Sequence, residues 1–432
     1  MPLWSSCLRI CRPGPSEGKD DVKAAASTLP GTDRLAGLAG RESALVYVIG
    51  FWLALIQISI AASQIVLTIV LLVWLYRLAA GKAELVRLPF DWPLGLFALC
   101  SIASAGFSFE PAESFASAKK LALLAIPYVV VSVVRRTSTL ERLVLVLIVV
   151  ADLGALFSLW QYFFSDLGDI NHRIRGFMSH YMTFAGLLMG VGVLAFAELL
   201  FGRRRRAFLA GSLVLILVAL ALSLTRSAWI GVLVAFGLLC FLRDRRLLIG
   251  IPVILIGAML LVPSDVEKRV RSFVRPDRSS RDRMYMLKSG IQMTANHPWF
   301  GVGPNMVKSV YPIYRLEGAP HLQNIHLHNN VVQIAAERGL PCLLAWLWLM
   351  AIGLTVSIRS YRAVPTGGRA PPENSGRGLA AGALALIGAG LTAGLFEYNF
   401  GDSEFLMLFL FAMGIPVVLE RNRTETPGDV QS

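Results

Sequence analysis

Charged residues are scarce in this sequence: they make up 16% of the 432 residues, against 55% hydrophobic residues. Soluble domains carry about 25% charged residues and about 45–50% apolar residues. The composition therefore excludes an ordinary soluble protein. Cysteine is scarce as well. Cys100, Cys240 and Cys342 lie in apolar runs, and the other two cysteines precede the first run, which excludes the disulfide framework of a small secreted domain.

Acidic residues are outnumbered by basic residues, 28 to 41, so the formal net charge is +13. This excess does not indicate nucleic-acid binding, because the basic residues fall in short clusters between long apolar runs. That arrangement is typical of the loops between membrane helices. The mean hydropathy of +0.61 agrees with it. The sequence therefore predicts an all-α polytopic membrane protein.

The apolar runs predict the number of membrane spans, since a helix needs about 20 mostly apolar residues to cross the bilayer. Residues 43–76 carry no charge over 34 residues, which predicts two closely spaced helices with a break at Ala62-Ser63-Gln64. The further predicted spans are 92–109, 118–134, 143–163, 176–201, 207–224, 227–242, 247–262, 339–358, 378–397 and 404–420. The total is twelve. Asp152 lies within one of them, where a carboxylate is either functional or hydrogen-bonded inside the bundle.

Lysine and arginine predict the orientation, because cytoplasmic loops retain positive charge. With the N-terminus inside, 25 of the 41 basic residues fall on the inner side, so both termini are predicted to be cytoplasmic. The predicted organisation is a disordered cytoplasmic tail (1–42), helices one to nine (43–263), a long outer loop with short helices (264–327), helices ten to twelve (328–420) and a second cytoplasmic tail (421–432).

The outer loop breaks the charge rule: residues 264–327 contain ten basic and five acidic side chains. A long soluble loop is translocated regardless of its charge, so the excess has a trivial explanation. The alternative is an anion site that faces away from the cytoplasm, and it is favoured because Arg173, Arg175 and Arg226 are predicted on the same side. The planar guanidinium group grips phosphate oxygens in pairs.

Within the outer loop, apolar residues at helical spacing predict a short helix that begins after Ser280 as N-cap and ends near Asn296. Arg283 is expected in its first turn, where backbone N–H groups and the helix dipole favour phosphate. Gly301-Val302-Gly303 follows and predicts a tight turn rather than a phosphate-binding loop.

Three histidines, His321, His326 and His328, precede the tenth predicted span. Their spacing matches zinc sites poorly and no cysteine or acidic residue is close, so no metal and no cofactor is predicted. A histidine beside an arginine-rich anion site suits a general base, because its pKa lies near the working pH. His328 is the candidate base and His326 the alternative; the spacing also leaves open a surface histidine bonded to backbone.

These residues carry a resemblance to a known family. His328-Asn329, nine residues and Gly339 resemble the His-[Asn/Ser/Gln]-x₉-Gly-x-x-Gly signature of O-antigen ligases, with Cys342 in place of the second glycine. Four further segments resemble other family elements in the same order: Arg175-Gly176 to His180, Leu224 to Trp229, Arg283 through Pro298 to Gly303, and Glu397 to Glu404. The resemblance covers about residues 44–420 and extends to the sister O-antigen polymerases.

The resemblance implies a glycosyltransferase at the periplasmic face of the bacterial inner membrane, in lipopolysaccharide biosynthesis. It would transfer O-antigen from undecaprenyl diphosphate to the lipid A–core oligosaccharide, by metal-independent inverting attack. Its partners would be these two substrates and membrane lipids, without nucleic acid. An O-antigen polymerase is the alternative, and a polytopic transporter is the third interpretation, although no internal repeat supports it.

The candidate site residues follow from this chemistry. A departing diphosphate develops negative charge that preorganised arginines stabilise. Arg226 and Arg283 are the predicted diphosphate ligands, with Arg175 as a third. The other outer-face candidates are Asn329, Arg338, Glu397 and Asp402.

Overall fold

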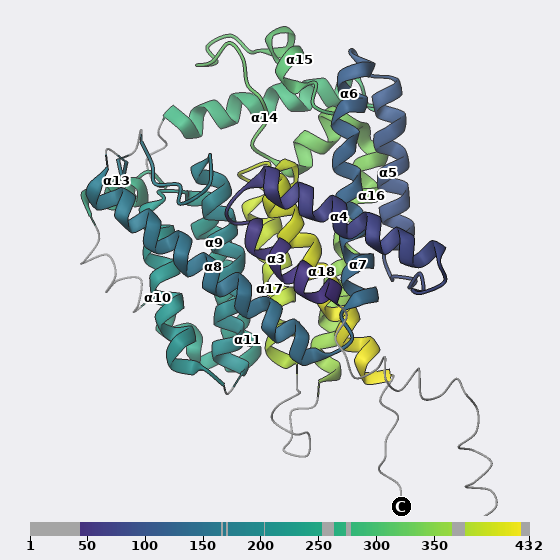
Figure 1. Cartoon of the computed structure of the whole chain (residues 1–432). Coiled ribbons are helices and arrows are strands. Elements are labelled where there is room, and N and C mark those ends of the chain that lie inside the picture. Colours follow the sequence, from purple (N-terminus) through teal and green to yellow (C-terminus); the bar gives the residue numbers. More distant parts are fainter. Residues whose placement is uncertain are drawn as a thin grey trace, which may run out of the picture. The chain divides into compact units, whose positions relative to one another are not determined.

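The computed structural model describes residues 44–165, 167–169, 172–202, 204–252, 263–273, 278–364 and 376–424. The described residues from Leu45 onward belong to one compact unit. Within this unit, the described residues form helices and connecting turns, without a strand among them. The predicted all-α class is therefore confirmed for this part of the chain (Figure 1).

Several helices have the length and composition of membrane spans. In the described ranges, seven helical segments are long and apolar enough to cross a membrane. They are α4 (Ile60–Ala79), the run of α6 (Pro111–Ser117), η1 (Ala118–Ala125) and α7 (Ile126–Val133), α8 (Thr137–Phe164), α9 (Tyr181–Phe201), α11 (Arg226–Arg243), α16 (Asn330–Ala363) and α18 (Ser403–Thr424). Shorter helices accompany them: α3 (Ala44–Leu55), α5 (Asp91–Gly106), α10 (Arg206–Leu222) and α17 (Arg377–Ala393). The chain is thus a multi-pass membrane protein, and the number twelve stays a prediction.

The predicted spans coincide with helices along most of the chain. Each of them except 247–262 overlaps one of the helices above over most of its length. The short helix η2 (Arg245–Ile249) covers the beginning of that segment, and residues 253–262 lie outside the described residues. The predicted span 176–201 begins later than expected, at Tyr181, because the His180 side chain caps α9 by accepting a hydrogen bond from the backbone N–H of Met182.

The predicted break in the first apolar run was wrong by about one helical turn. α3 ends at Leu55 and α4 begins at Ile60, after Ser59, whose hydroxyl accepts from the backbone N–H of Ala62 at 3.4 Å. Ser63 lies inside α4 and donates its hydroxyl to the Ile60 carbonyl, so it does not break the helix. With 12 residues, α3 is about 18 Å long at 1.5 Å per residue, short of the hydrocarbon thickness.

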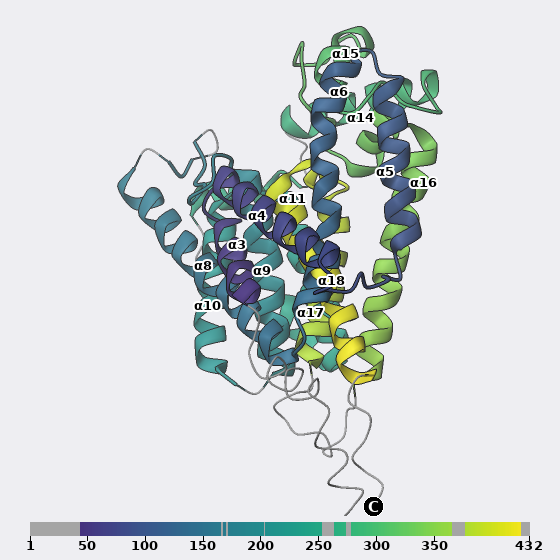
Figure 2. The same ribbon diagram turned by 45° about the vertical axis from the view of Figure 1, so that its right-hand side comes forward.

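The centre of the bundle is formed by α17 and α18, which lie between the α8–α11 group and the α5–α16 pair in both views (Figures 1 and 2). Close packing depends on small residues, as in other membrane bundles. At Gly231 of α11, an added Cβ would lie 2.3 Å from the Met189 sulfur and 3.0 Å from the Ala389 carbonyl oxygen. α11 therefore packs tightly against both α9 and α17.

Two polar positions inside the bundle are explained by helix contacts. Asp152 of α8 accepts a hydrogen bond from the Ser212 hydroxyl of α10 at 2.6 Å, which confirms the interpretation of a hydrogen bond inside the bundle. Cys342 of α16 is fully buried, and its sulfur lies 3.5 Å from the Ser101 hydroxyl of α5. Cys342, which stands where the ligase signature has its second glycine, thus packs against a neighbouring helix.

The predicted outer loop contains three helices: α13 (Ser264–Arg271), α14 (Arg278–Asn296) and α15 (Val307–Tyr314). α14 ends at Asn296 as predicted, but it begins at Arg278. Ser280 therefore lies inside the helix and Arg283 in its second turn, so both of these predictions were wrong. Asp277, which directly precedes Arg278 in the sequence, is an equally favourable N-cap residue type.

Gly301-Val302-Gly303 forms a tight connection, as predicted. Gly301 and Gly303 have positive φ angles of 67° and 110°, which favour glycine. The backbone N–H groups of Val302 and Gly303 donate to the carbonyls of Ala336 and Glu337 in α16. Gly339, with φ 77°, makes the kink in α16 that receives this segment. The glycines thus join the predicted outer loop to α16.

Cysteine labelling tests the predicted orientation. In a chain whose five native cysteines are replaced, the substitutions Arg204→Cys and Ser309→Cys put thiols at exposed positions between α9 and α10 and in α15. The distribution of basic residues predicts that they lie on opposite sides of the membrane. A membrane-impermeant maleimide supplied from the periplasmic side should modify position 309 and leave position 204 unmodified until the membrane is dissolved. Modification of both positions in sealed membranes would overturn the orientation.

Candidate functional site

The beginning of α16 is fastened to the connection between α17 and α18. Asn329 caps α16 by accepting from the Val332 N–H at 3.0 Å, and its amide donates to the Leu395 carbonyl at 2.9 Å. Asn330 is buried and donates to the Asn399 side chain at 2.7 Å. These bonds bring His328 next to Glu397, 69 residues further along the chain.

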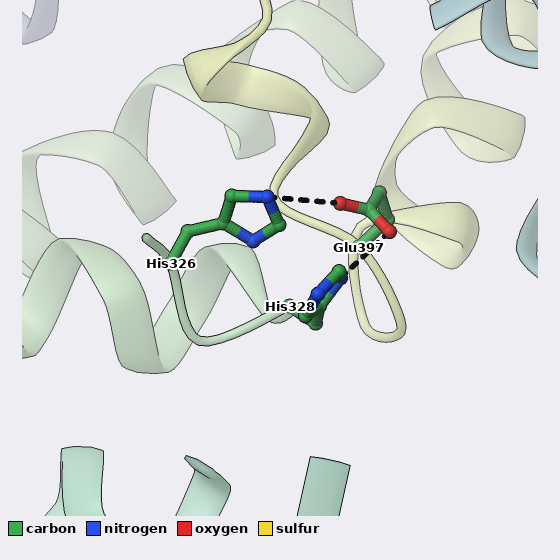
Figure 3. A group of neighbouring side chains, drawn as sticks. All are labelled: His326, His328 and Glu397. Carbon is green, nitrogen blue, oxygen red and sulfur yellow. Dashed lines mark hydrogen bonds and ion pairs between the residues drawn. The ribbon is translucent and has the colours of Figure 1, made fainter. Parts of the chain in front are cut away.

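Glu397 is the centre of a cluster that includes both predicted histidines (Figure 3). One carboxylate oxygen, Oε2, lies 2.8 Å from Nδ1 of His328 and 3.5 Å from Nη2 of Arg283. The other, Oε1, lies 3.9 Å from Nε2 of His326. The two imidazole rings are 4.1 Å apart. The structure therefore brings together four of the predicted site residues from three separate elements: His326, His328, Arg283 and Glu397.

The charge of Glu397 fixes the tautomer of His328. Burial raises the pKa of the Glu397 carboxyl. The effect of His328, through its charge and its hydrogen bond, together with the charges of His326 and Arg283, outweighs burial and lowers that pKa to about 2. The carboxylate is therefore ionised at neutral pH and accepts the hydrogen bond, so Nδ1 of His328 carries the proton. Among the described residues, Nε2 of His328 has no hydrogen-bond partner. In the neutral ring this nitrogen is free to accept a proton.

His326 differs from His328 in its environment. Burial, and after it the neighbouring charge of His328, lower the pKa of His326 to about 4, although Glu397 opposes the shift. The ring is therefore neutral at pH 7. Its Nδ1 is buried and has no hydrogen-bond partner among the residues that the structure describes.

Two cavities meet at this cluster. The larger one, of about 610 Å³, is lined by Lys119, Lys120, Arg338, Glu397 and Asp402 among others. The smaller one, of about 330 Å³, is lined by Asp282, Met286, His321, Gln323, Asn324, Ile325, His326 and His328. His326 and Ile325 line both cavities. Both volumes are within the range of ligand sites, about 300–1,000 Å³.

A buried polar network holds the histidine segment in place. The backbone N–H of Leu327, between the two histidines, donates to Gln333 at 2.6 Å. Gln333 in turn donates to Glu337 at 2.8 Å, and Arg338 bonds to Glu337 at 3.0 Å and to the Tyr398 hydroxyl at 3.3 Å. This chain of bonds links the histidines to Arg338 on the wall of the larger cavity.

Sequence reasoning missed several of these residues. Gln333 and Glu337 are polar residues shortly before a long apolar run, and this position in the sequence was the available signal; both are buried in the structure. Lys119 and Lys120 stand at the outer end of the predicted span 118–134. Lys120 donates to the Gly401 carbonyl at 2.7 Å, and neither lysine has an ion-pair partner among the described residues.

The remaining predicted site residues lie in different surroundings. Asp402 lines the larger cavity and accepts from the Thr183 hydroxyl at 2.6 Å. Arg226 is buried at the beginning of α11, where Nη1 donates to the Ser272 hydroxyl at 2.9 Å. Arg175 is exposed and donates to the Ser179 carbonyl. Neither Arg226 nor Arg175 is among the described residues that line the two cavities.

One cluster has the composition of a metal site. In the described ranges, the ligand atoms of His326, His328 and Glu397 lie within 4.8 Å of one another. His321, the third histidine of the sequence pattern, lies instead 3.7 Å from Asp282. Arg283 contributes a positive charge 3.5 Å from Glu397, which opposes a divalent cation at this position. A metal-independent site stays a prediction, and chelators test it.

These features define a multi-pass membrane protein with an ionised carboxylate and two histidines where helix ends meet. Residues 211–347 match the family model described as O-Antigen ligase. The match includes Arg226, Arg283, His326, His328 and Arg338, and it ends before Glu397. The resemblance inferred from the sequence is thus confirmed over these residues, and it indicates transfer of lipid-linked glycans of the ligase or polymerase type. No curated protein matches the chain.

The lowered pKa of His326 predicts a pH effect on stability. The pKa is about 4 in the folded chain and 6.5 in an unperturbed histidine. Between these values the unfolded state binds more protons at this residue, so stability falls as the pH decreases through this window. The thermal midpoint in detergent should therefore fall from pH 7 to pH 5, and the fall should be smaller for His326→Asn. His172→Asn, in an exposed loop, is the control. Equal falls in wild type and His326→Asn would contradict the prediction.

Proposed function

We propose that the chain is an O-antigen ligase: it transfers O-antigen from undecaprenyl diphosphate to lipid A–core oligosaccharide at the periplasmic face of the bacterial inner membrane. The observation that carries the proposal is the hydrogen bond from Nδ1 of His328 to the ionised Glu397. It leaves Nε2 of His328 as a proton acceptor at the smaller cavity, beside His326, which lines both cavities. The match of residues 211–347 to the ligase family supports the substrate class.

The reaction needs one proton transfer and one displacement. His328 Nε2 takes the proton from an acceptor hydroxyl as its oxygen attacks the anomeric carbon of the donor sugar. The bond between that carbon and the diphosphate oxygen breaks, and undecaprenyl diphosphate leaves with the electron pair. Glu397 stabilises the imidazolium that forms, as the carboxylate does in other histidine-base sites. A single displacement inverts the anomeric centre.

The leaving diphosphate needs positive charge, and the described cations near Glu397 supply it. Arg283 lies 3.5 Å from Glu397, and Lys119, Lys120 and Arg338 line the larger cavity. Of the acidic groups in that cavity, Glu113 pairs with Lys308, Glu337 with Arg338 and Glu397 with Arg283, whereas Asp402 accepts from the Thr183 hydroxyl. We therefore assign the donor diphosphate to the larger cavity, near Glu397; Arg283 pairs with Glu397 but is not itself among the described residues that line the cavity. Roles for Arg226 and Arg175 remain predictions.

Reconstituted transfer separates the ligase from the alternatives. Purified chain in proteoliposomes receives undecaprenyl-diphosphate-linked glycan, with or without lipid A–core and with or without a chelator. A ligase links glycan to lipid A–core without lengthening the donor glycan, and the chelator has no effect. Lengthening of the lipid-linked glycan without lipid A–core would identify a polymerase instead. Uptake of a solute without any glycosyl transfer would identify a transporter.

Replacing the base should abolish turnover and spare donor binding. Loss of a general base lowers rates by about 10²–10⁴, so His328→Ala should lose at least about a hundredfold in kcat while its affinity for the donor stays close to wild type. Higher pH should restore part of the rate, because the hydroxyl then needs less help in losing its proton. His172→Ala is the matched control in an exposed loop. Transfer at wild-type rates by His328→Ala would refute the assignment of the base.

The arginine at the cluster should not be replaceable by lysine. Arg283→Lys keeps the charge and loses the paired donors of the guanidinium, so kcat/KM should fall more than about tenfold. Arg281→Lys, on the same helix and exposed, is the matched control and should transfer normally. Near-normal kinetics of Arg283→Lys would show that its role is limited to charge or folding.

A further inference from the structure

The smaller cavity is bordered by polar atoms that the protein leaves unpaired. Oδ1 of Asp282, Nδ2 of Asn324 and Nδ1 of His326 are buried, and none has a hydrogen-bond partner among the described residues. All three residues line the cavity of about 330 Å³. The Asp282 side chain is only 9% exposed. Buried polar atoms without a partner destabilise a fold, so three in residues around one cavity indicate a ligand that pairs with them.

The identity of these atoms indicates the chemistry of that ligand. The Asp282 oxygen is an acceptor, the Asn324 amide is a donor, and the His326 nitrogen is either one according to its tautomer. A sugar hydroxyl both donates and accepts, so neighbouring hydroxyls of one ring can satisfy such a mixed set. Among the described residues that line the cavity, Asp282 is the acidic one, and none is a lysine or arginine. An anionic group such as diphosphate is therefore disfavoured there.

The position of the cavity indicates which substrate it holds. His328 and His326 form part of its wall, whereas Lys119, Lys120 and Arg338 line the other cavity. A hydroxyl bound in the smaller cavity thus lies beside the base, and a diphosphate in the larger cavity lies on the other side of His326. The two substrates would meet at the histidines from opposite cavities.

We propose that the smaller cavity is the acceptor subsite, which binds an uncharged sugar ring through Asp282 and Asn324 and presents one of its hydroxyls to His328. This inference rests on the proposed glycosyl transfer, but it is the same for a ligase and a polymerase, because both attack with a sugar hydroxyl. Asp282 and Asn324 are binding residues in this scheme and take no proton from the substrate.

Thiol protection tests the subsite without relying on transfer. In a chain free of native cysteines, Gln323→Cys places a thiol in an exposed position of the cavity wall. Methyl α-glucoside, methyl α-galactoside and lactose are the neutral probes, inorganic pyrophosphate is the anionic probe, and Ser309→Cys outside the cavity is the control. At least one neutral sugar should slow maleimide modification of position 323 several-fold and leave position 309 unaffected. Protection by pyrophosphate alone, or by none of the probes, would overturn the proposal.

Substitutions of Asp282 and Asn324, which carry unpaired polar atoms, are the second test of the proposal. Asp282→Asn and Asn324→Leu should each remove sugar protection at position 323 and raise the KM for acceptor about tenfold, the equivalent of one lost hydrogen bond. The KM for donor should stay unchanged. An increase in donor KM alone would place the donor in this cavity and refute the proposal. Elution as a single species in detergent establishes folding of each variant. If the wild-type chain transfers no glycan but sugars still protect position 323, the sugar subsite is supported and the proposed reaction is refuted.

Discussion

The contact between Glu397 and His328 is the interaction on which the rest of the site depends. An ionised carboxylate that is only 13% exposed is stable only with opposite charges and hydrogen bonds around it. His328 supplies a hydrogen bond from the segment before α16, and Arg283 supplies a positive charge from α14. Removing one partner of a buried pair typically destabilises a protein by about 3–5 kcal/mol. The cluster thus holds α14, the segment before α16 and the connection between α17 and α18 together.

The scaffold keeps these elements at a fixed separation. Asn329 and Asn330 fasten the first turn of α16 to the connection between α17 and α18, and Gly301 and Gly303 bring the segment after α14 onto the same helix. α18 is almost entirely buried, so the connection before it has a rigid support. Catalytic geometry built on fixed elements needs little reorganisation during the reaction.

The two cavities differ in the residues that line them. Lys119, Lys120 and Arg338 line the larger one beside four carboxylates, and the described wall of the smaller one presents an acid, two amides and histidine rings. A lipid diphosphate and a sugar hydroxyl differ in the same way, so two chemically different walls that share His326 can sort the two substrates. In the proposed reaction the base, His328, belongs to the wall of the smaller cavity, because proton removal and departure of the diphosphate would occur at opposite ends of one displacement.

Sequence alone was sufficient for the properties that depend on composition and local order. The apolar runs predicted the membrane class and most helices, since the hydrophobic length of a span is set by the bilayer, and the order of short motifs predicted the family match of residues 211–347. Tertiary structure decided the rest. The position of Glu397 beside His328 depends on packing between segments 69 residues apart, and no local pattern encodes it. The separation of Arg226 from the cavity-lining residues, and the unpaired groups at Asp282 and Asn324, likewise exist only once distant helices have packed, because burial and partner atoms are properties of the folded chain.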